Sequence, residues 1–183
     1  MVTLRLTKRE AAGPDGQPVI GRGYEVRDEQ AQPLPRQALA PERFDAIAVV
    51  EVAPSSPEER QALRTPGFAL DRPVQLTPQA EGLAVRDAAG ERVAGWVPEP
   101  HAAATARLLE ERGDEVETWV CWEWLREDGR SGADVAISLP EAKPQRLGPP
   151  QPSQRSGVVG DRRVWLGLTA VVVLVALAFA ACA

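Results

Sequence analysis

The last 20 residues of this 183-residue chain, 164–183, contain no charged side chain. As a helix, their sequence VWLGLTAVVVLVALAFAACA would be about 30 Å long, which matches the hydrocarbon thickness of a bilayer. A helix also satisfies its own backbone hydrogen bonds in lipid. The segment therefore predicts one transmembrane helix. The alternative is a buried core helix, although about 10–14 residues is the more usual length for an uncharged one.

Positive charge flanks this segment at its N-terminal side. Arg162 and Arg163 come directly before it, no charged residue follows, and Trp165 suits the membrane interface. The positive-inside rule then places the preceding residues in the cytoplasm. The first 16 residues lack the apolar core of about 7–15 residues that a signal peptide needs. We therefore expect a single-pass protein in the plasma membrane, anchored at its C-terminal end, with its N-terminal domain cytoplasmic.

Acidic residues are concentrated in the middle of the chain. Residues 44–139 hold 9 basic and 18 acidic side chains, a net charge of −9, while the whole chain carries −5. An acidic domain repels phosphate backbones, so broad affinity for nucleic acid is disfavoured. The two cysteines, Cys121 and Cys182, lie far apart in the sequence. They indicate neither a disulfide framework nor a metal cluster.

The composition divides the chain into four parts. Residues 140–161 hold five prolines and few large apolar groups, which predicts a linker before the membrane helix. Residues 1–43 predict an N-terminal extension with one or two strands. Alternation of apolar and polar residues over 2–6 indicates the first strand, and Tyr24 and Val26 indicate the second. The remaining part, residues 44–139, carries the strongest folding signals.

Two helices are expected in this central part. The sequence S-P-E-E from Ser56 to Glu59 is a capping box with proline at the first helical position. A second helix is expected over 102–112, where Gly113 supplies the C-terminal cap.

Short β-branched and aromatic runs predict strands between the helices, and the sequences DAAG and EDGR predict two hairpin turns. The expected strands cover residues 46–52, 73–77, 83–86, 91–97, 117–125 and 133–139. The predicted fold is mainly β with two short helices. Its expected form is a small OB- or SH3-like β-barrel, with one C-terminal transmembrane helix in addition.

The order of these parts resembles a HIRAN domain over roughly residues 44–139. A first strand and a helical insertion are followed by D-R-P-V-Q-L at 71–76, and a helix ends in L-L-E-E-R-G at 108–113. The central hairpin at 82–98 closes in G-W-V-P, which is similar to the G-Y-L-P-like close of that family. The resemblance implies an OB-like barrel. It also implies a relation to domains that capture the 3′ end of single-stranded DNA.

The loop that binds DNA in that family departs from the pattern here. The family carries an Asn-Pro-Tyr-Asp-x-Asn-Ala-like stretch whose aromatic ring stacks on a base. Residues 77–82 of this chain read TPQAEG, without the aromatic ring, the Asp or the Asn, and Glu81 adds a negative charge. The resemblance therefore implies the fold and not the DNA-end activity.

Tryptophans and arginines are the candidate binding residues. By strand alternation Trp122 and Trp124 share one face, whereas Trp119 is expected on the other. A stacking surface for bases or Pro-rich peptides and simple core packing are both open interpretations. Arginines near the central hairpin are expected either to form a basic strip or to pair with neighbouring acids. The candidate set comprises Arg72, Arg86, Arg92, Trp96, Trp122 and Trp124.

Motifs for catalysis are not found in the sequence. His101 is the only histidine, and no Ser or Cys stands in a recognisable relation to it. No phosphate-binding loop, H-E-x-x-H motif or Cys/His metal spacing occurs, so no enzyme, cofactor or metal is predicted. We expect a non-catalytic binding or regulatory module that binds the lipid bilayer and a protein partner. The alternative is a membrane-tethered protein that binds single-stranded nucleic-acid ends.

Overall fold

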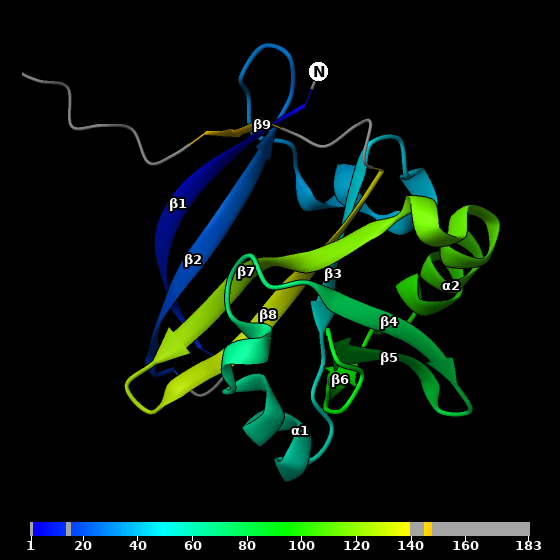
Figure 1. Cartoon of the computed structure of the whole chain (residues 1–183). Coiled ribbons are helices and arrows are strands. Elements are labelled where there is room, and N and C mark those ends of the chain that lie inside the picture. The colour runs from blue at the N-terminus through cyan, green and yellow to red at the C-terminus, as the bar shows by residue number, and fades with distance from the viewer. Residues whose placement is uncertain (1, 14–15, 140–144, 148–183) are drawn as a thin grey trace, which may run out of the picture. The chain divides into compact units, whose positions relative to one another are not determined.

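The computed structural model describes residues 2–13, 16–139 and 145–147, and it forms two sheets (Figure 1). In the described residues the larger sheet has six strands. Neighbouring strands are antiparallel except β1 and β9, which are parallel. In spatial order the strands are β3 (Ile47–Val52), β8 (Gly129–Ser138), β7 (Glu117–Arg126), β2 (Pro18–Arg27), β1 (Thr3–Ala12) and β9 (Gln145–Leu147).

The smaller sheet is an antiparallel meander, and the helical segments connect or flank the strands. Its strands are β4 (Val74–Gln79), β5 (Gly82–Asp87) and β6 (Val93–Trp96). The α-helices are α1 (Pro57–Leu63) and α2 (His101–Arg112). The 3-10 turns are η1 (Arg36–Leu39), η2 (Pro41–Arg43), η3 (Pro66–Phe68) and η4 (Gly113–Glu115).

The predicted helices and hairpins form as the local sequence indicates. Ser56 accepts a hydrogen bond from the amide of Glu59, whose side chain accepts from the Ser56 amide in return, which completes the capping box of α1. Gly113 ends α2 at a positive φ of 49°. The two predicted turns connect β5 to β6 and β7 to β8. The mainly β fold with two helices is confirmed.

The N-terminal strands belong to the same sheet as the central ones. β1 and β2 pair over ten positions, from Thr3 with Arg27 to Ala12 with Pro18. β2 then pairs with β7, so strands from residues 1–43 and from 44–139 share hydrogen bonds. In Figure 1 the blue β1 and β2 lie along one edge of the yellow-green β7. Met1–Pro149 form one compact unit.

A closed β-barrel was predicted, and the described residues do not form one. In the described residues the backbone pairing between the two sheets consists of isolated bridges, Ala53 with Trp96 at one junction and Pro73 with Trp119 at the other. A barrel needs a continuous hydrogen-bonded ladder at every junction. β7 instead continues its ladder to β2, so the N-terminal hairpin extends the sheet beyond the point where a barrel would close. The barrel prediction was wrong because it treated residues 44–139 without this hairpin.

Apolar residues cover both faces of the larger sheet. Alternation along β8 sends Val135 and Ile137 to one face and Ala136 to the other. The first face packs against α1, α2 and the smaller sheet, through residues that include Leu63, Phe68, Leu83, Val85, Leu108 and Val120. The second face carries a tryptophan cluster of Leu4, Val26, Leu39, Ile47, Trp119, Cys121, Trp122 and Ala136.

The predicted transmembrane helix, residues 164–183, and its flanking residues Arg162, Arg163 and Trp165 lie outside the described residues. The predicted linker lies outside them as well, except for 145–147. Of the helices that the structure describes, none has both the length and the apolar character needed to span a bilayer.

Candidate functional site

A β-bulge in β7 brings three tryptophans to one face of the sheet. Val120 pairs with Val135 and Trp122 with Asp134, so Cys121 is an extra residue between two neighbouring pairs. Cys121 and Trp122 therefore both join the tryptophan cluster, which also contains Trp119. The predicted shared face of Trp122 and Trp124 is confirmed, since Trp124 packs against the same cluster.

The prediction that Trp119 points to the opposite face was wrong. Strict alternation holds only while each residue has one partner, and the bulge at Cys121 resets it. Trp119 lies edge-on against Tyr24, with 5.7 Å between ring centroids. Trp122 and Trp124 follow, with centroids 5.8 Å apart and planes tilted by 53°. The three rings thus form one aromatic layer with Tyr24.

Two glycines on β2 make room for this layer. A Cβ atom at Gly21 would lie 2.7 Å from the Trp124 ring and 2.8 Å from Nε1 of Trp122. A Cβ at Gly23 would lie 2.4 Å from the carbonyl oxygen of Cys121 and 2.5 Å from the Trp122 ring. Because real Cβ atoms do not approach other atoms so closely, the rings can lie flat on β2 only where its side chains are absent.

A cavity of about 150 Å³ opens beside these rings and is called the Trp122 cavity below. β1, β2, β7, β8 and the turn η1 all contribute to it. Its lining combines three aromatic side chains with two arginines and two carboxylates: Tyr24, Trp122, Trp124, Arg9, Arg36, Glu25 and Asp134.

Arg9 covers the aromatic side of the cavity. Its Cζ lies 5.4 Å from the centroid of the Trp122 ring, which is the geometry of a cation–π contact. Its Nη2 donates to Oε1 of Glu25 at 2.6 Å, while Arg27 donates to the other carboxylate oxygen. Burial acts to raise the pKa of Glu25, but the hydrogen bonds from Arg27 and Arg9 outweigh it, so this pKa is lower than the ordinary value. Glu25 is thus a carboxylate with both oxygens paired.

Asp134 forms the buried end of the cavity. Its Oδ2 accepts from Nη2 of Arg36 at 2.7 Å, whereas its Oδ1 is buried without a hydrogen-bond partner. Burial raises the pKa of Asp134 to about 6, although the nearby Arg36 guanidinium acts to lower it. Nε1 of Trp122 is likewise buried without a partner. Among the described residues, the cavity lining thus includes one residue with an unused acceptor, Asp134, and one with an unused donor, Trp122, whose Nε1 lies over Gly21 of β2.

The raised pKa of Asp134 predicts a pH-dependent stability. Its folded pKa of about 6 exceeds the ordinary value of 3.8, so the folded state binds the proton more tightly than the unfolded state. The associated stability is complete below about pH 4 and is lost as the pH rises through 6. Relative to Asp134→Asn, the wild-type chain should lose up to about 3 kcal/mol between about pH 4 and about pH 7. Urea unfolding of both proteins across this range measures the difference, and a constant difference would contradict the assignment.

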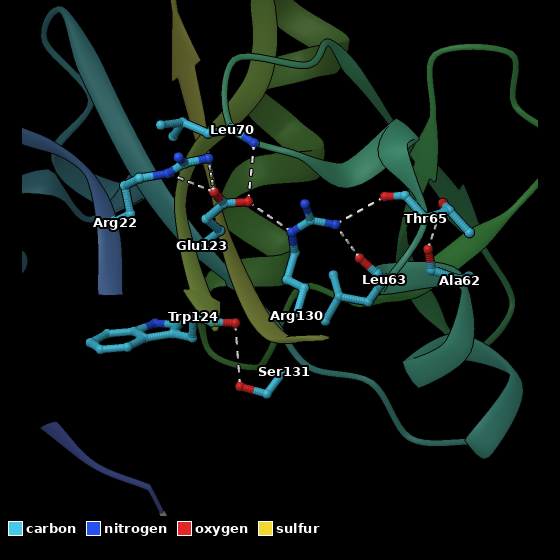
Figure 2. Close-up of polar contacts among 9 residues, drawn as sticks. All are labelled: Arg22, Ala62, Leu63, Thr65, Leu70, Glu123, Trp124, Arg130 and Ser131. Carbon is cyan, nitrogen blue, oxygen red and sulfur yellow. Dashed lines mark hydrogen bonds and ion pairs between the residues drawn. The ribbon is translucent and has the colours of Figure 1, made fainter. Parts of the chain in front are cut away.

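Glu123 lies between Trp122 and Trp124 in β7 and points to the opposite face, where it binds Arg22, Leu70 and Arg130 (Figure 2). This side chain is almost completely buried, at 1% exposure. Its Oε1 accepts from Nη2 of Arg22 at 2.5 Å, and its Oε2 accepts from Nε of Arg130 at 2.9 Å and from the amide of Leu70 at 3.3 Å. Figure 2 shows the carboxylate between the two guanidinium groups. We call Arg22, Glu123 and Arg130 the carboxylate clamp.

The clamp connects distant parts of the fold. Nη1 of Arg130 donates to the carbonyl oxygens of Leu63, at 2.8 Å, and Thr65, at 2.9 Å, at the end of α1. Arg22 stands on β2 between the two glycines that accommodate the tryptophans. Gly21 and Gly23 therefore leave room for the indole rings on one face of β2, while Arg22 between them pairs with the buried Glu123 on the other.

The predicted arginines lie elsewhere, on or near the smaller sheet. Arg72 is exposed before β4, and its carbonyl oxygen accepts from the Val120 amide at 2.9 Å. Arg86 donates through Nη1 to the carbonyl oxygen of Gly90 at 2.8 Å. Arg92 is exposed and lines a separate cavity together with Glu59. Nε1 of Trp96 donates to Oε1 of Glu59 at 2.9 Å, so Trp96 belongs to the neighbourhood of α1 and not to the aromatic layer.

No family model, curated protein or solved structure matches this chain. The resemblance to HIRAN domains therefore stays a prediction.

The described residues show no arrangement typical of catalysis. Burial raises the pKa of the Cys121 thiol well above its ordinary value, so this thiol stays protonated and is a poor nucleophile. Nδ1 of His101 lies 2.9 Å from Oε1 of Glu42 in an exposed pair. Within the ranges described, no group of three or more His, Cys, Asp or Glu side chains is placed to hold a metal ion. Among the described residues that line the Trp122 cavity, Cys121 is thus the one thiol, and it is protonated.

Sequence reasoning missed several residues of this site. Arg9, Glu25 and Arg36 come from the first 43 residues. The pairing of β2 with β7 brings Arg9 and Glu25 near the tryptophans, and η1 brings Arg36 to Asp134. One signal was available in the sequence. The run C-W-E-W places a charged residue among aromatic ones, and G-R-G in β2 offers two small residues around a cation. These two patterns fit each other across a strand pair, as the structure has them.

Proposed function

We propose that this chain is a membrane-tethered, non-catalytic module that presents a HIRAN-like domain to the cytoplasm and binds a protein partner there. The observation that carries the proposal is the Trp122 cavity. It combines aromatic rings with half-exposed arginines, and both are enriched where proteins bind one another. The order of strands and helices in 44–139 supports the HIRAN-like fold in an open form.

The tether is proposed from the uncharged sequence of 164–183 and the two arginines before it. The full chain should sediment with membranes and should be released by detergent but not by alkaline carbonate. Deletion of 164–183 should leave the protein in the supernatant. Protease added outside whole cells should leave the N-terminal domain intact. Recovery of the full chain in the supernatant without detergent would refute the proposed membrane tether.

Binding of a protein partner is tested by capture from the protein's own cells. We expect the detergent-solubilised full chain to retain a partner that Trp124→Ala loses by about tenfold or more, because tryptophan is a common binding hot spot. Arg92→Ser is the matched control, since Arg92 is exposed and lies away from the Trp122 cavity. Circular dichroism verifies that both variants fold. Equal capture by Trp124→Ala and wild type would refute the cavity as the interface.

A membrane-tethered binder of nucleic-acid ends is the second candidate. Arg9 lies beside the Trp122 ring, and proteins that bind single-stranded nucleic acid combine arginines with aromatic rings in the same way. The net charge of −9 over residues 44–139 acts against it. A gel-shift titration of the detergent-solubilised full chain with 3′-ended single strands separates the candidates. Micromolar binding that weakens steeply with salt would favour nucleic acid over protein.

A further inference from the structure

Two half-exposed arginines stand at the rim of the Trp122 cavity. The side chain of Arg9 is 57% exposed and that of Arg36 is 52% exposed. Each forms its ion pair through one terminal nitrogen, Arg9 with Glu25 and Arg36 with Asp134. A guanidinium group has five N–H donors, so each arginine keeps donors for a ligand at the rim.

The interior of the cavity suits a flat apolar group. The rings of Trp122 and Trp124 form one wall, and the apolar residues Val26, Leu34 and Leu39 contribute to the rest. A cavity of about 150 Å³ accommodates a group as large as a benzene ring.

Charge around the cavity decides which polar group fits beside the apolar one. Arg9, Arg27 and Arg36 carry three positive charges, against four carboxylates in or next to the lining, Glu25, Glu51, Asp71 and Asp134. A cationic ligand finds one open acceptor among these groups, Oδ1 of Asp134, and that atom is buried, whereas both oxygens of Glu25 already accept from guanidinium groups. An anionic ligand needs no displacement, since it accepts from donors that remain. The exposed N–H donors of Arg9 and Arg36 therefore favour an anion at the rim, although carboxylates outnumber arginines around the cavity.

From this geometry we propose that the Trp122 cavity binds a carboxylate attached to an aromatic or other flat apolar group, as an acidic peptide of a partner protein presents it. The carboxylate accepts from Arg9 and Arg36 at the rim, and the apolar group lies against Trp124 and the part of the Trp122 ring that lines the cavity beside Arg9. The proposal rests on the proposed protein-binding function and names the chemistry of the partner at the same site.

Phenylacetate is the simplest probe, and its neutral isostere phenylacetamide is the matched ligand control. In titrations of the detergent-solubilised full chain followed by indole NMR signals, phenylacetate should shift the Trp122 and Trp124 signals saturably. Phenylacetamide should bind about tenfold more weakly or worse, because it lacks the charge-assisted hydrogen bonds. Arg9→Gln should weaken phenylacetate by a similar factor and leave phenylacetamide unchanged. Arg92→Gln should change neither.

Equal affinities for phenylacetate and phenylacetamide would overturn the proposal, as would an Arg9→Gln variant that binds phenylacetate like wild type. Competition by an oligodeoxythymidylate at lower concentration than phenylacetate would also overturn it and assign the cavity to nucleic acid.

These outcomes distinguish a failure of the carboxylate inference from a failure of the proposed protein-binding function. Loss of partner capture in Trp124→Ala without carboxylate preference refutes this inference alone, whereas carboxylate preference with unchanged capture refutes the protein-binding function alone.

Discussion

Glu123→Gln should lower the free energy of unfolding by about 3 kcal/mol or more. The substitution keeps the shape of the side chain but removes the charge that two guanidinium groups share. Arg130 is only 10% exposed, so its charge would remain buried without a counter-ion. Urea unfolding of the detergent-solubilised full chain, followed by tryptophan fluorescence, measures the loss.

Two variants serve as controls for the destabilisation by Glu123→Gln. Arg22→Gln should cost less, below about 1.5 kcal/mol, because Arg22 is 45% exposed and water replaces its contact. Glu127→Gln should change stability by no more than about 0.5 kcal/mol, since Glu127 is exposed at the β7–β8 turn. If Glu123→Gln is no more destabilising than Glu127→Gln, the clamp does not hold the strands together.

Gly23→Ala should destabilise the protein by about 3 kcal/mol or more. The new Cβ would lie 2.4 Å from the carbonyl oxygen of Cys121 and 2.6 Å from the Cα of Trp122. Both are backbone atoms in a hydrogen-bonded strand, so neither can move away without breaking the β2–β7 pairing. Urea unfolding measures this loss too. The same substitution should abolish the phenylacetate response, because the Trp122 ring would be displaced.

Gly132→Ala is the control for this substitution. Its Cβ would lie 3.2 Å from the Trp124 ring, a side-chain atom that can shift by a few tenths of an ångström. Alanine also restricts the unfolded chain, which favours folding by about 0.4–1 kcal/mol. The stability of Gly132→Ala should therefore stay close to that of wild type. Equal stability of Gly23→Ala and Gly132→Ala would mean that the aromatic layer does not depend on close approach to β2.

The local elements could be predicted from the sequence because their causes are local. The capping box at Ser56 and Glu59 needs only residues three positions apart, and a turn such as DAAG needs only four. The shared face of Trp122 and Trp124 also follows from two-residue alternation. The placement of Trp119 did not follow, because the bulge at Cys121 depends on what β8 offers opposite it.

The candidate site depended on partners that sequence spacing does not specify. Arg72, Arg86, Arg92 and Trp96 were chosen for their position near the central hairpin, and they lie on or beside the smaller sheet. Trp122 and Trp124 do line the cavity, but its charged groups come from β1, β2, η1 and β8. Residues far apart in the sequence meet there, since Arg9 of β1 and Asp134 of β8 line the same cavity.

The sequence by itself determined the β-rich class, the two helices, the hairpin turns and the expectation of a membrane anchor, since each follows from composition or short-range periodicity. Only the tertiary structure decided that β1 and β2 extend the larger sheet, that no barrel closes within the described residues, and that Arg9 and Arg36 line the same cavity as Trp122 and Trp124. The reason is physical. Strand pairing joins backbone groups without regard to distance along the chain, and the order of strands in a sheet is set by the packing of whole surfaces.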